Sequence, residues 1–148
     1  MRISTKGRYG LRAVIDIAEN CGDGQVSLKD VAQRQGISDN YLEQIIFPLK
    51  KAGIVKSVRG SQGGYLLARS AAEISVGEVL RVLEGDLAPV DCLASGEGIA
   101  CSRSSICPTV GMWKRLQDAI NAVVDSTSVQ NLIDEGKQRS YLDCGTNI

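Results

Sequence analysis

The chain has 148 residues, which suits one globular domain with an extension. Hydrophobic residues make up 43% and charged residues 23%, proportions that exclude a disordered chain. No stretch approaches the ~18 uncharged apolar residues of a membrane span, and the basic N-terminus lacks the apolar region of a signal peptide. We therefore expect a cytoplasmic protein, without a membrane partner, whose five cysteines are reduced. The sequence contains no histidine and no nucleotide-binding glycine motif, so we do not expect an enzyme.

The net charge of zero conceals two halves of opposite sign. Residues 1–70 hold 11 Lys and Arg against 6 Asp and Glu, whereas residues 71–148 hold 6 against 11. A basic half joined to an acidic half indicates that one part meets a polyanion. The simpler alternative is two solvated faces of one domain.

The first half of the chain predicts a helix-turn-helix. Apolar residues recur at helical spacing over 8–21, and Thr5 is a candidate N-cap. Ser27 begins a second, short helix that Gly36 ends, and Ser38 caps a third. Pro48 lies inside this third segment, where we expect a kink or the end of regular hydrogen bonding. The short Q-G-I-S link between the second and third helices is typical of a helix-turn-helix.

The pattern then changes from helix to hairpin and back. Residues 54–58 and 65–67 are strand-like and enclose a glycine-rich turn over 59–64. Ser75 and Glu78 form a capping box that opens a fourth helix. The fold class that we predict is mainly α: a winged helix-turn-helix DNA-binding domain over 1–85 with a long C-terminal dimerisation helix.

The remainder of the chain divides into three parts. Residues 86–108 lose periodicity and read as a cysteine-rich loop. Residues 109–135 comprise a long amphipathic helix, expected to pair with a second copy of the chain, and a short following helix. Residues 136–148 read as a flexible polar tail. Because Trp113 and Phe47 are the only tryptophan and phenylalanine, the chain has few large aromatic residues with which to build a core.

Basic and polar residues cluster where double-stranded DNA would need them. No acid lies between Glu43 and Glu73, a stretch rich in Lys and Arg. Amide and hydroxyl groups at the exposed start of the third helix can bond base edges in the major groove. An arginine at the hairpin tip can enter a minor groove. The predicted DNA-binding residues are Arg2, Lys6, Arg8, Ser38, Asn40, Tyr41, Gln44, Lys50, Lys56, Arg59, Gly60 and Gln62. Alternatively, several of them are ordinary cap and solvated residues.

Three cysteines in the loop predict a metal centre. Cys92, Cys101 and Cys107 lie on a glycine- and serine-rich segment that allows thiols to converge. Thiolates favour iron–sulfur clusters and zinc, both of which usually take four protein ligands. Cys144 lies in the tail, and the spacing of Cys21 fits a buried position in the first helix. Redox-sensing thiols remain an alternative, and spacing alone does not choose between the two metals.

Four segments together resemble a known family: MRISTKGRYGLRA, QGISDNYLEQII, VKSVRGSQGGYLLA and SVGEVLRVLEG. They are similar to the IscR family of winged-helix transcription regulators, which includes NsrR and CymR, over roughly residues 1–125. The resemblance implies a homodimer paired through the helix near 109–125. It also implies that Cys92, Cys101 and Cys107 ligate an iron–sulfur cluster, most simply 2Fe–2S, because CymR-like members lack this trio.

The sequence departs from the family at the cluster ligands. The eight residues between Cys92 and Cys101 exceed the usual spacing. Val110 stands where IscR has its histidine ligand, and Arg8 where NsrR-like members supply an aspartate. The fourth ligand stays open, and a small thiol or water would also serve. The protein candidates are Asp91, Glu97, Ser104 and Cys144.

These observations lead to one hypothesis and two alternatives. We expect a DNA-binding repressor that senses iron–sulfur status and controls genes of cluster biogenesis. One alternative is a winged-helix regulator of cysteine metabolism or of nitrosative or redox stress that uses thiols, zinc or a protein partner. The other is an iron–sulfur carrier without a DNA role.

Overall fold

The N-terminal part of the protein is built on three short helices. The computed structural model describes residues 2–22, 24–94 and 101–145, with the backbone alone for 141–145. Helix α1 spans Thr5–Asn20, α2 spans Leu28–Gln35 and α3 spans Asp39–Lys51. The hydroxyls of Ser4, Ser27 and Ser38 cap these helices by accepting a backbone N–H three residues on. The caps at Ser27 and Ser38 are confirmed, whereas Ser4, not Thr5, caps α1.

Of the two effects expected of Pro48, a kink or the end of regular hydrogen bonding, it does not end the helix: α3 continues past it to Lys51. Proline removes one hydrogen bond, the one that would end on the carbonyl of Gln44. Gln44 is exposed, and water can therefore satisfy that carbonyl. The missing hydrogen bond also lies near the C-terminal end of the helix, where few further backbone hydrogen bonds follow.

One apolar core joins the three helices to the hairpin. Its fully buried members come from α1, α2, α3, the first strand, α4 and α6, and from the residues just before that strand and before α4; among them are Ile17, Val31, Leu42, Ile45, Ile46, Leu49, Ile54, Ile74, Val79 and Val129. Cys21, predicted to be buried within the first helix, is instead the half-buried C-cap residue of α1.

One carboxylate is buried beside this core and ties α1 to α2. Asp16 is 5% exposed, and Arg34 donates to it at 2.6 Å while Gln35 donates at 2.8 Å. The hydrogen bond that Arg34 donates to Asp16 raises the pKa of the Arg34 guanidinium above its usual value. A buried charge that kept no partner would be strongly destabilising, so this pair fixes how α2 sits on α1.

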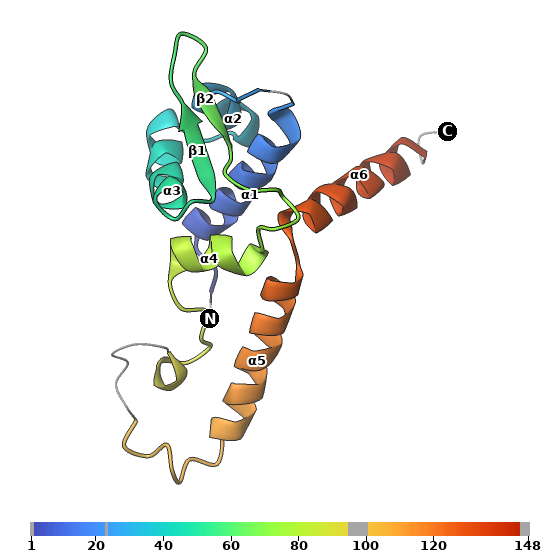
Figure 1. The fold of residues 1–148 in the computed structure, drawn as a ribbon. Helices are drawn as coiled ribbons and strands as arrows, with labels where there is room; N and C mark the ends of the chain where they lie inside the picture. The colour runs from blue at the N-terminus through green and yellow to red at the C-terminus, as the bar shows by residue number, and fades with distance from the viewer. Residues whose placement is uncertain (1, 23, 95–100, 146–148) are drawn as a thin grey trace.

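The hairpin is the wing of the fold, as predicted (Figure 1). Strand β1 spans Val55–Val58 and pairs antiparallel with β2, Gly64–Leu67. The sheet gains a third short contact where Val26 and Tyr65 exchange backbone hydrogen bonds of 2.8 and 2.7 Å. The segment before α2 therefore supports the wing.

Helix α4, Val76–Glu84, begins with the predicted capping box of Ser75 and Glu78. The Ser75 backbone N–H, then Arg69, hydrogen-bond the Glu78 carboxylate and lower its pKa. One face of α4 joins the main core through Val79 and Leu83, while its other face forms a second apolar cluster with Ile120 and Val124 of α5. Helix α5 spans Val110–Ser126 and follows a loop whose described residues include the 3-10 turn Asp91–Leu93.

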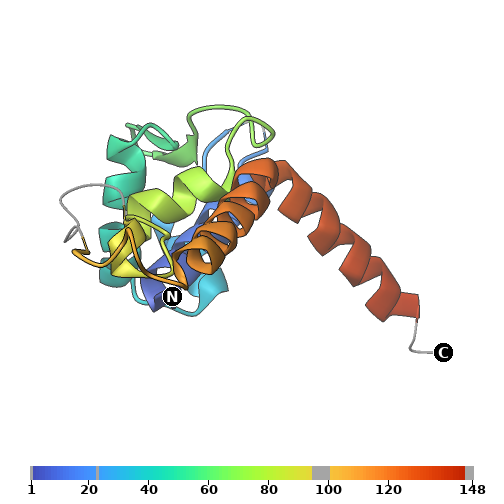
Figure 2. The ribbon, with the colours of Figure 1, turned by 90° about the horizontal axis from the view of Figure 1, so that it is seen from below.

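The corner between α5 and α6 is fastened to the start of α4. Ser75 and Ser128 form a β-bridge, in which Val76 donates to the Thr127 carbonyl and Val129 to the Ile74 carbonyl, both at 2.9 Å. From there α6, Val129–Gly145, projects away from the body (Figures 1 and 2).

The predicted short helix and polar tail form one helix in the structure. Residues 136–145, expected to be flexible, continue α6. This stretch lacks the apolar periodicity on which the prediction relied, but it contains helix-forming Lys137, Gln138 and Arg139 and no proline. None of the helices in the described part of the chain is long and apolar enough to cross a membrane.

The contact between Glu84 and the start of α1 makes stability pH-dependent. Burial raises the pKa of Glu84, but hydrogen bonds from the Ser4 hydroxyl and backbone N–H outweigh it, and the net pKa is lowered. The carboxylate therefore stabilises the fold above its ordinary pKa of about 4.3, and this contribution is lost as the pH falls through the folded-state value.

We expect Glu84→Gln to lower the free energy of unfolding by about 1 kcal/mol at pH 7, because the neutral amide is a weaker acceptor. The difference in unfolding free energy between the variant and the wild type should be smaller at pH 3, because the carboxylate is then partly protonated. Urea unfolding at both pH values measures it, with Glu19→Gln, at an exposed position of α1, as the control. A gap that stays constant with pH would contradict this role for Glu84.

Candidate nucleic-acid interface and cysteine loop

The exposed face of α3 carries the polar residues predicted to read bases. Asn40 and Gln44 are exposed, and together with Glu43 and Phe47 they line a shallow hollow on the helix surface. Their spacing of three, four and seven residues places all four on one side of the helix. The opposite side, which includes Leu42 and Ile46, is fully buried. Helix α3 is thus held by its apolar side and presents its polar side outward.

Two residues predicted to contact DNA have structural roles at the start of α3. The Ser38 hydroxyl accepts the N–H of Tyr41 at 3.2 Å and caps the helix. Tyr41 is half-buried, and its ring meets that of Tyr9 edge-on at 6.2 Å. Arg12 lies over the Tyr9 ring at 5.1 Å and donates to Gln35. This aromatic pair joins α1 to α3 and so orients the exposed face.

Most of the predicted DNA-binding cations are exposed. The side chains of Arg2, Arg8, Lys50, Lys56 and Arg59 are exposed, and that of Lys6 is half-buried. The ion pairs within the described ranges use other cations, namely Arg34, Arg69 and Arg81. Arg69, which the sequence placed in the same basic stretch, is therefore engaged by Glu78.

The wing carries Arg59, Gly60 and Gln62 at its exposed tip. Gly60 has φ of +131°, a conformation that L side chains rarely adopt, so glycine permits the tight turn there. The Gln25 side chain donates to the carbonyl of Gln62. This contact, with the Val26–Tyr65 bridge, holds the wing tip from its base.

The three loop cysteines lie between α4 and α5, but the structure does not gather them. Cys92 is exposed within the 3-10 turn, and Cys101 and Cys107 are half-buried. Among the described residues, no three Cys, Asp or Glu side chains are close enough to share a metal ion. The segment 95–100, between Cys92 and Cys101, lies outside the described residues.

The candidates for the fourth ligand are dispersed. Asp91 and Ser104 are exposed on the loop. Glu97 lies outside the described residues. Cys144 belongs to the last turn of α6, and α6 ends far from the loop (Figures 1 and 2).

Cys107 sits just before the first turn of α5. Its sulfur lies 3.2 Å from the hydroxyl of Thr109, which makes no capping bond to the helix. Hydrogen bonds from the Thr109 hydroxyl and then its backbone N–H lower the pKa of the Cys107 thiol. The thiolate, the form that binds metals, is thereby favoured.

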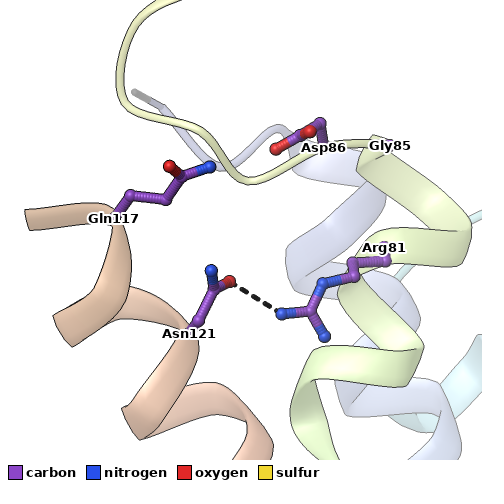
Figure 3. A pocket seen from close by; sticks show the side chains of 5 residues that line it. All are labelled: Arg81, Gly85, Asp86, Gln117 and Asn121. Atoms are coloured by element: carbon purple, nitrogen blue, oxygen red, sulfur yellow. Dashed lines mark hydrogen bonds between the residues drawn. The ribbon is translucent and has the colours of Figure 1, made fainter. Parts of the chain in front are cut away.

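A polar pocket of about 280 Å³ separates α4 from α5 near the loop (Figure 3). Arg81 reaches across it to Asn121 at 2.8 Å and to Asp125 at 2.5 Å. Arg81 lowers the pKa of Asp125, mainly through this hydrogen bond. On the loop side, the Gln117 amide donates to the Leu93 carbonyl at 3.2 Å.

The helices approach closely at this joint. A Cβ at Gly77 would displace the Asp125 carboxylate and the Arg81 guanidinium, so glycine leaves room for this ion pair. Residues from α4, from α5 and from the loop are thus joined by direct polar contacts.

Comparison with known proteins identifies the family. A model of the Rrf2 family, described as iron-dependent transcriptional regulators, matches residues 3–135. The chain belongs to the Rrf2 family. It is therefore a DNA-binding transcriptional regulator with a winged-helix fold and not an enzyme, as predicted. A carrier without a DNA role does not agree with this membership.

Relatives with two different regulatory names are similar to the chain. The regulator CymR of Bacillus subtilis is 42% identical, over 96% of this chain and 98% of its own. IscR of Enterobacter is 36% identical over 95% and 89% of the two chains. The solved structure of T. potens IscR has a TM-score of 0.75 and 41% identity, and the match covers 94% of this chain and 90% of that one.

Sequence reasoning missed two residues on the exposed face of α3. In the sequence, Glu43 marks the start of an acid-free stretch, and Phe47 is one of the few aromatic residues available for a core. Phe47 is instead 71% exposed. The spacing from Asn40 was the available signal, since it places both on the side opposite Leu42.

Gln44→Ala should relax sequence preference at one position of each half-site, because an amide that bonds a base edge contributes about 1–3 kcal/mol of discrimination. Lys56→Ala should weaken binding to all duplexes alike and reduce the slope of log K against log salt by about 1. Fluorescence anisotropy titrations at several salt concentrations measure both effects. If Gln44→Ala and Lys56→Ala changed affinity and sequence preference in the same way, the base-reading role of Gln44 would be contradicted.

Proposed function

We propose that this protein is a cytoplasmic, dimeric repressor whose loop holds an iron–sulfur cluster, most simply 2Fe–2S, and that it controls genes of cluster biogenesis. The observation that carries the proposal is the position of Cys92, Cys101 and Cys107. All three lie in the single segment that links the DNA-binding unit to α5. A ligand held there touches both parts of the protein.

The donor set suits such a cluster. Three thiols are available, none of them consumed in a disulfide, and thiolates are the ligands that iron–sulfur clusters prefer. The lowered pKa of Cys107 adds to this fit. A bound cluster would supply a redox-sensitive centre. The chain's own residues would position it, Cys92 from the 3-10 turn and Cys107 from the start of α5.

The comparisons support regulation but do not choose the signal. The description of the family as iron-dependent favours the cluster. Identity to CymR, 42%, and to T. potens IscR, 41%, is nearly equal. A second candidate therefore stands: control of cysteine metabolism or of a redox response through the thiols, through zinc or through a protein partner. The scattered cysteines of the described loop favour it, as does the similarity to a protein described as a global cysteine regulator.

Metal content separates the two candidates. Protein purified without oxygen should show visible charge-transfer bands and equal amounts of iron and acid-labile sulfide. The triple variant Cys92→Ala, Cys101→Ala, Cys107→Ala should lose both, whereas Cys21→Ala, outside the loop, should keep them. Zinc alone, or no metal after reconstitution, would favour the second candidate. Stoichiometric iron and sulfide in the triple variant would contradict the ligand assignment.

The C-terminal helices supply a surface for a second copy of the chain. Met112, Leu116 and Val123 are 41%, 40% and 65% exposed, and with Ala119 they form one stripe along α5. At the C-terminal end of this stripe, Ala119 and Val123 line an apolar hollow together with Ile120 and Val124. Exposure of such an apolar stripe to water is unfavourable. We propose that the α5 stripes of two protomers pack against each other. This pairing would space the two α3 helices for half-sites about 34–36 Å apart.

Val123→Glu should convert the dimer to a monomer, because two carboxylates would meet in the apolar interface. The variant should still fold, since the side chain is exposed in the protomer. Lys114→Glu is the matched control: it adds the same carboxylate to α5 about 200° round the helix from Met112. Sedimentation equilibrium measures the mass. A dimeric Val123→Glu variant would contradict this interface.

A further inference from the structure

Phe47 is a large apolar residue on the exposed face of α3. It is the only phenylalanine of the chain, and 71% of its surface is accessible to solvent. The core side of α3 is already complete, because Leu42, Ile46 and Leu49 are each at most 1% exposed. Phe47 is therefore not a core residue that the packing failed to reach; it belongs to the outward face.

Its neighbours on that face are polar. Asn40, Glu43 and Gln44 line the same hollow as Phe47. The apolar stripe of α5, by contrast, gathers several exposed apolar residues. An isolated ring among hydrogen-bonding side chains is suited to a surface that is itself mostly polar, with single apolar groups.

The major groove of DNA is such a surface. Its floor presents hydrogen-bond donors and acceptors, and the C5-methyl group of thymine is its apolar feature. Asn40 and Phe47 are seven residues apart, or about 10.5 Å along a helix that rises 1.5 Å per residue. That length covers about three base pairs at 3.4 Å each. The amides of Asn40 and Gln44 and the ring of Phe47 can thus face successive base pairs.

We propose that Phe47 reads a thymine in each half-site by contact of its ring with the C5-methyl group. This inference rests on the proposed role of α3 in reading base edges. Phe47 then sets specificity by an apolar contact at one position, beside positions that Asn40 and Gln44 read by hydrogen bonds. Uracil in place of that thymine keeps every hydrogen bond and removes only the methyl group.

The experiment begins with selection from a random duplex library by the full-length protein, purified without oxygen. The wild type should select a two-fold symmetric site with a thymine at the position nearest Phe47. Phe47→Ala and Phe47→Asn should lose the preference at that position and keep it elsewhere. Phe47→Leu, which retains an apolar side chain, should keep part of it. Gln44→Ala should change a neighbouring position instead.

Uracil substitution then isolates the methyl group. Replacing the selected thymine by uracil should weaken wild-type binding about fourfold, the effect of removing one buried methyl. The same replacement should leave the affinity of Phe47→Ala unchanged. Thermal unfolding of each variant confirms that it folds, which the exposure of Phe47 predicts.

Three outcomes would overturn the proposal. The first is a Phe47→Ala variant that keeps the thymine preference while Gln44→Ala alters its own position; α3 then still reads DNA, and only the role of Phe47 is lost. The second is equal weakening of Phe47→Ala on all duplexes, uracil-containing ones included. The third is a wild type that selects no particular sequence, or a Gln44→Ala variant with the same sequence preference as the wild type. Either result overturns the role of α3 as well.

Discussion

The two-sided packing of α4 is the constraint on which the rest of the structure depends. Val79 and Leu83 anchor it in the core that also holds α1 and α3, and Leu80 faces α5. Arg81 extends the second contact with a bridge to Asp125. Since interiors are close-packed and transmit small shifts, α5 and the DNA-binding helices move relative to one another only by repacking α4.

The cysteine loop connects the two helices of this contact, α4 and α5. The loop leaves the end of α4 and returns at the start of α5, so its two ends are the two partners of the joint (Figure 1). The Gln117–Leu93 bond ties it to α5 once more. The α5–α6 corner is fixed by backbone bonds at Thr127 and Val129. The loop is thus joined to the N-terminal end of α5, and the α5–α6 corner holds the opposite end.

The sequence predicted the features that local chemistry determines. Caps at Ser27, Ser38 and Ser75 depend on neighbouring residues only, and all three are present. The sequence is a poorer guide where the surroundings of a residue decide. Pro48 does not end α3, because the carbonyl that it leaves unbonded belongs to the exposed residue Gln44. Phe47 is exposed, because Leu42, Ile46 and Leu49 occupy the core side of α3. The candidate base-reading face of α3 is only partly predictable: helical spacing and residue type locate Asn40 and Gln44, whereas an apolar residue such as Phe47 is normally expected in the core.

Overall similarity does not choose between a CymR-like and an IscR-like role, because CymR is 42% and T. potens IscR 41% identical to the chain. The winged-helix part, from α1 to α4, makes up more than half of the 148 residues. The loop from Asp91 to Thr109 is short and weighs little in such a comparison. Under the proposed function, the signal acts on that loop, either on one centre shared by Cys92, Cys101 and Cys107 or on separate thiols. The proposed DNA contacts lie in a different segment, on the face of α3 that carries Gln44, and α4 packs between this unit and α5. Sensing and DNA reading, as proposed, therefore use different segments that one helix joins.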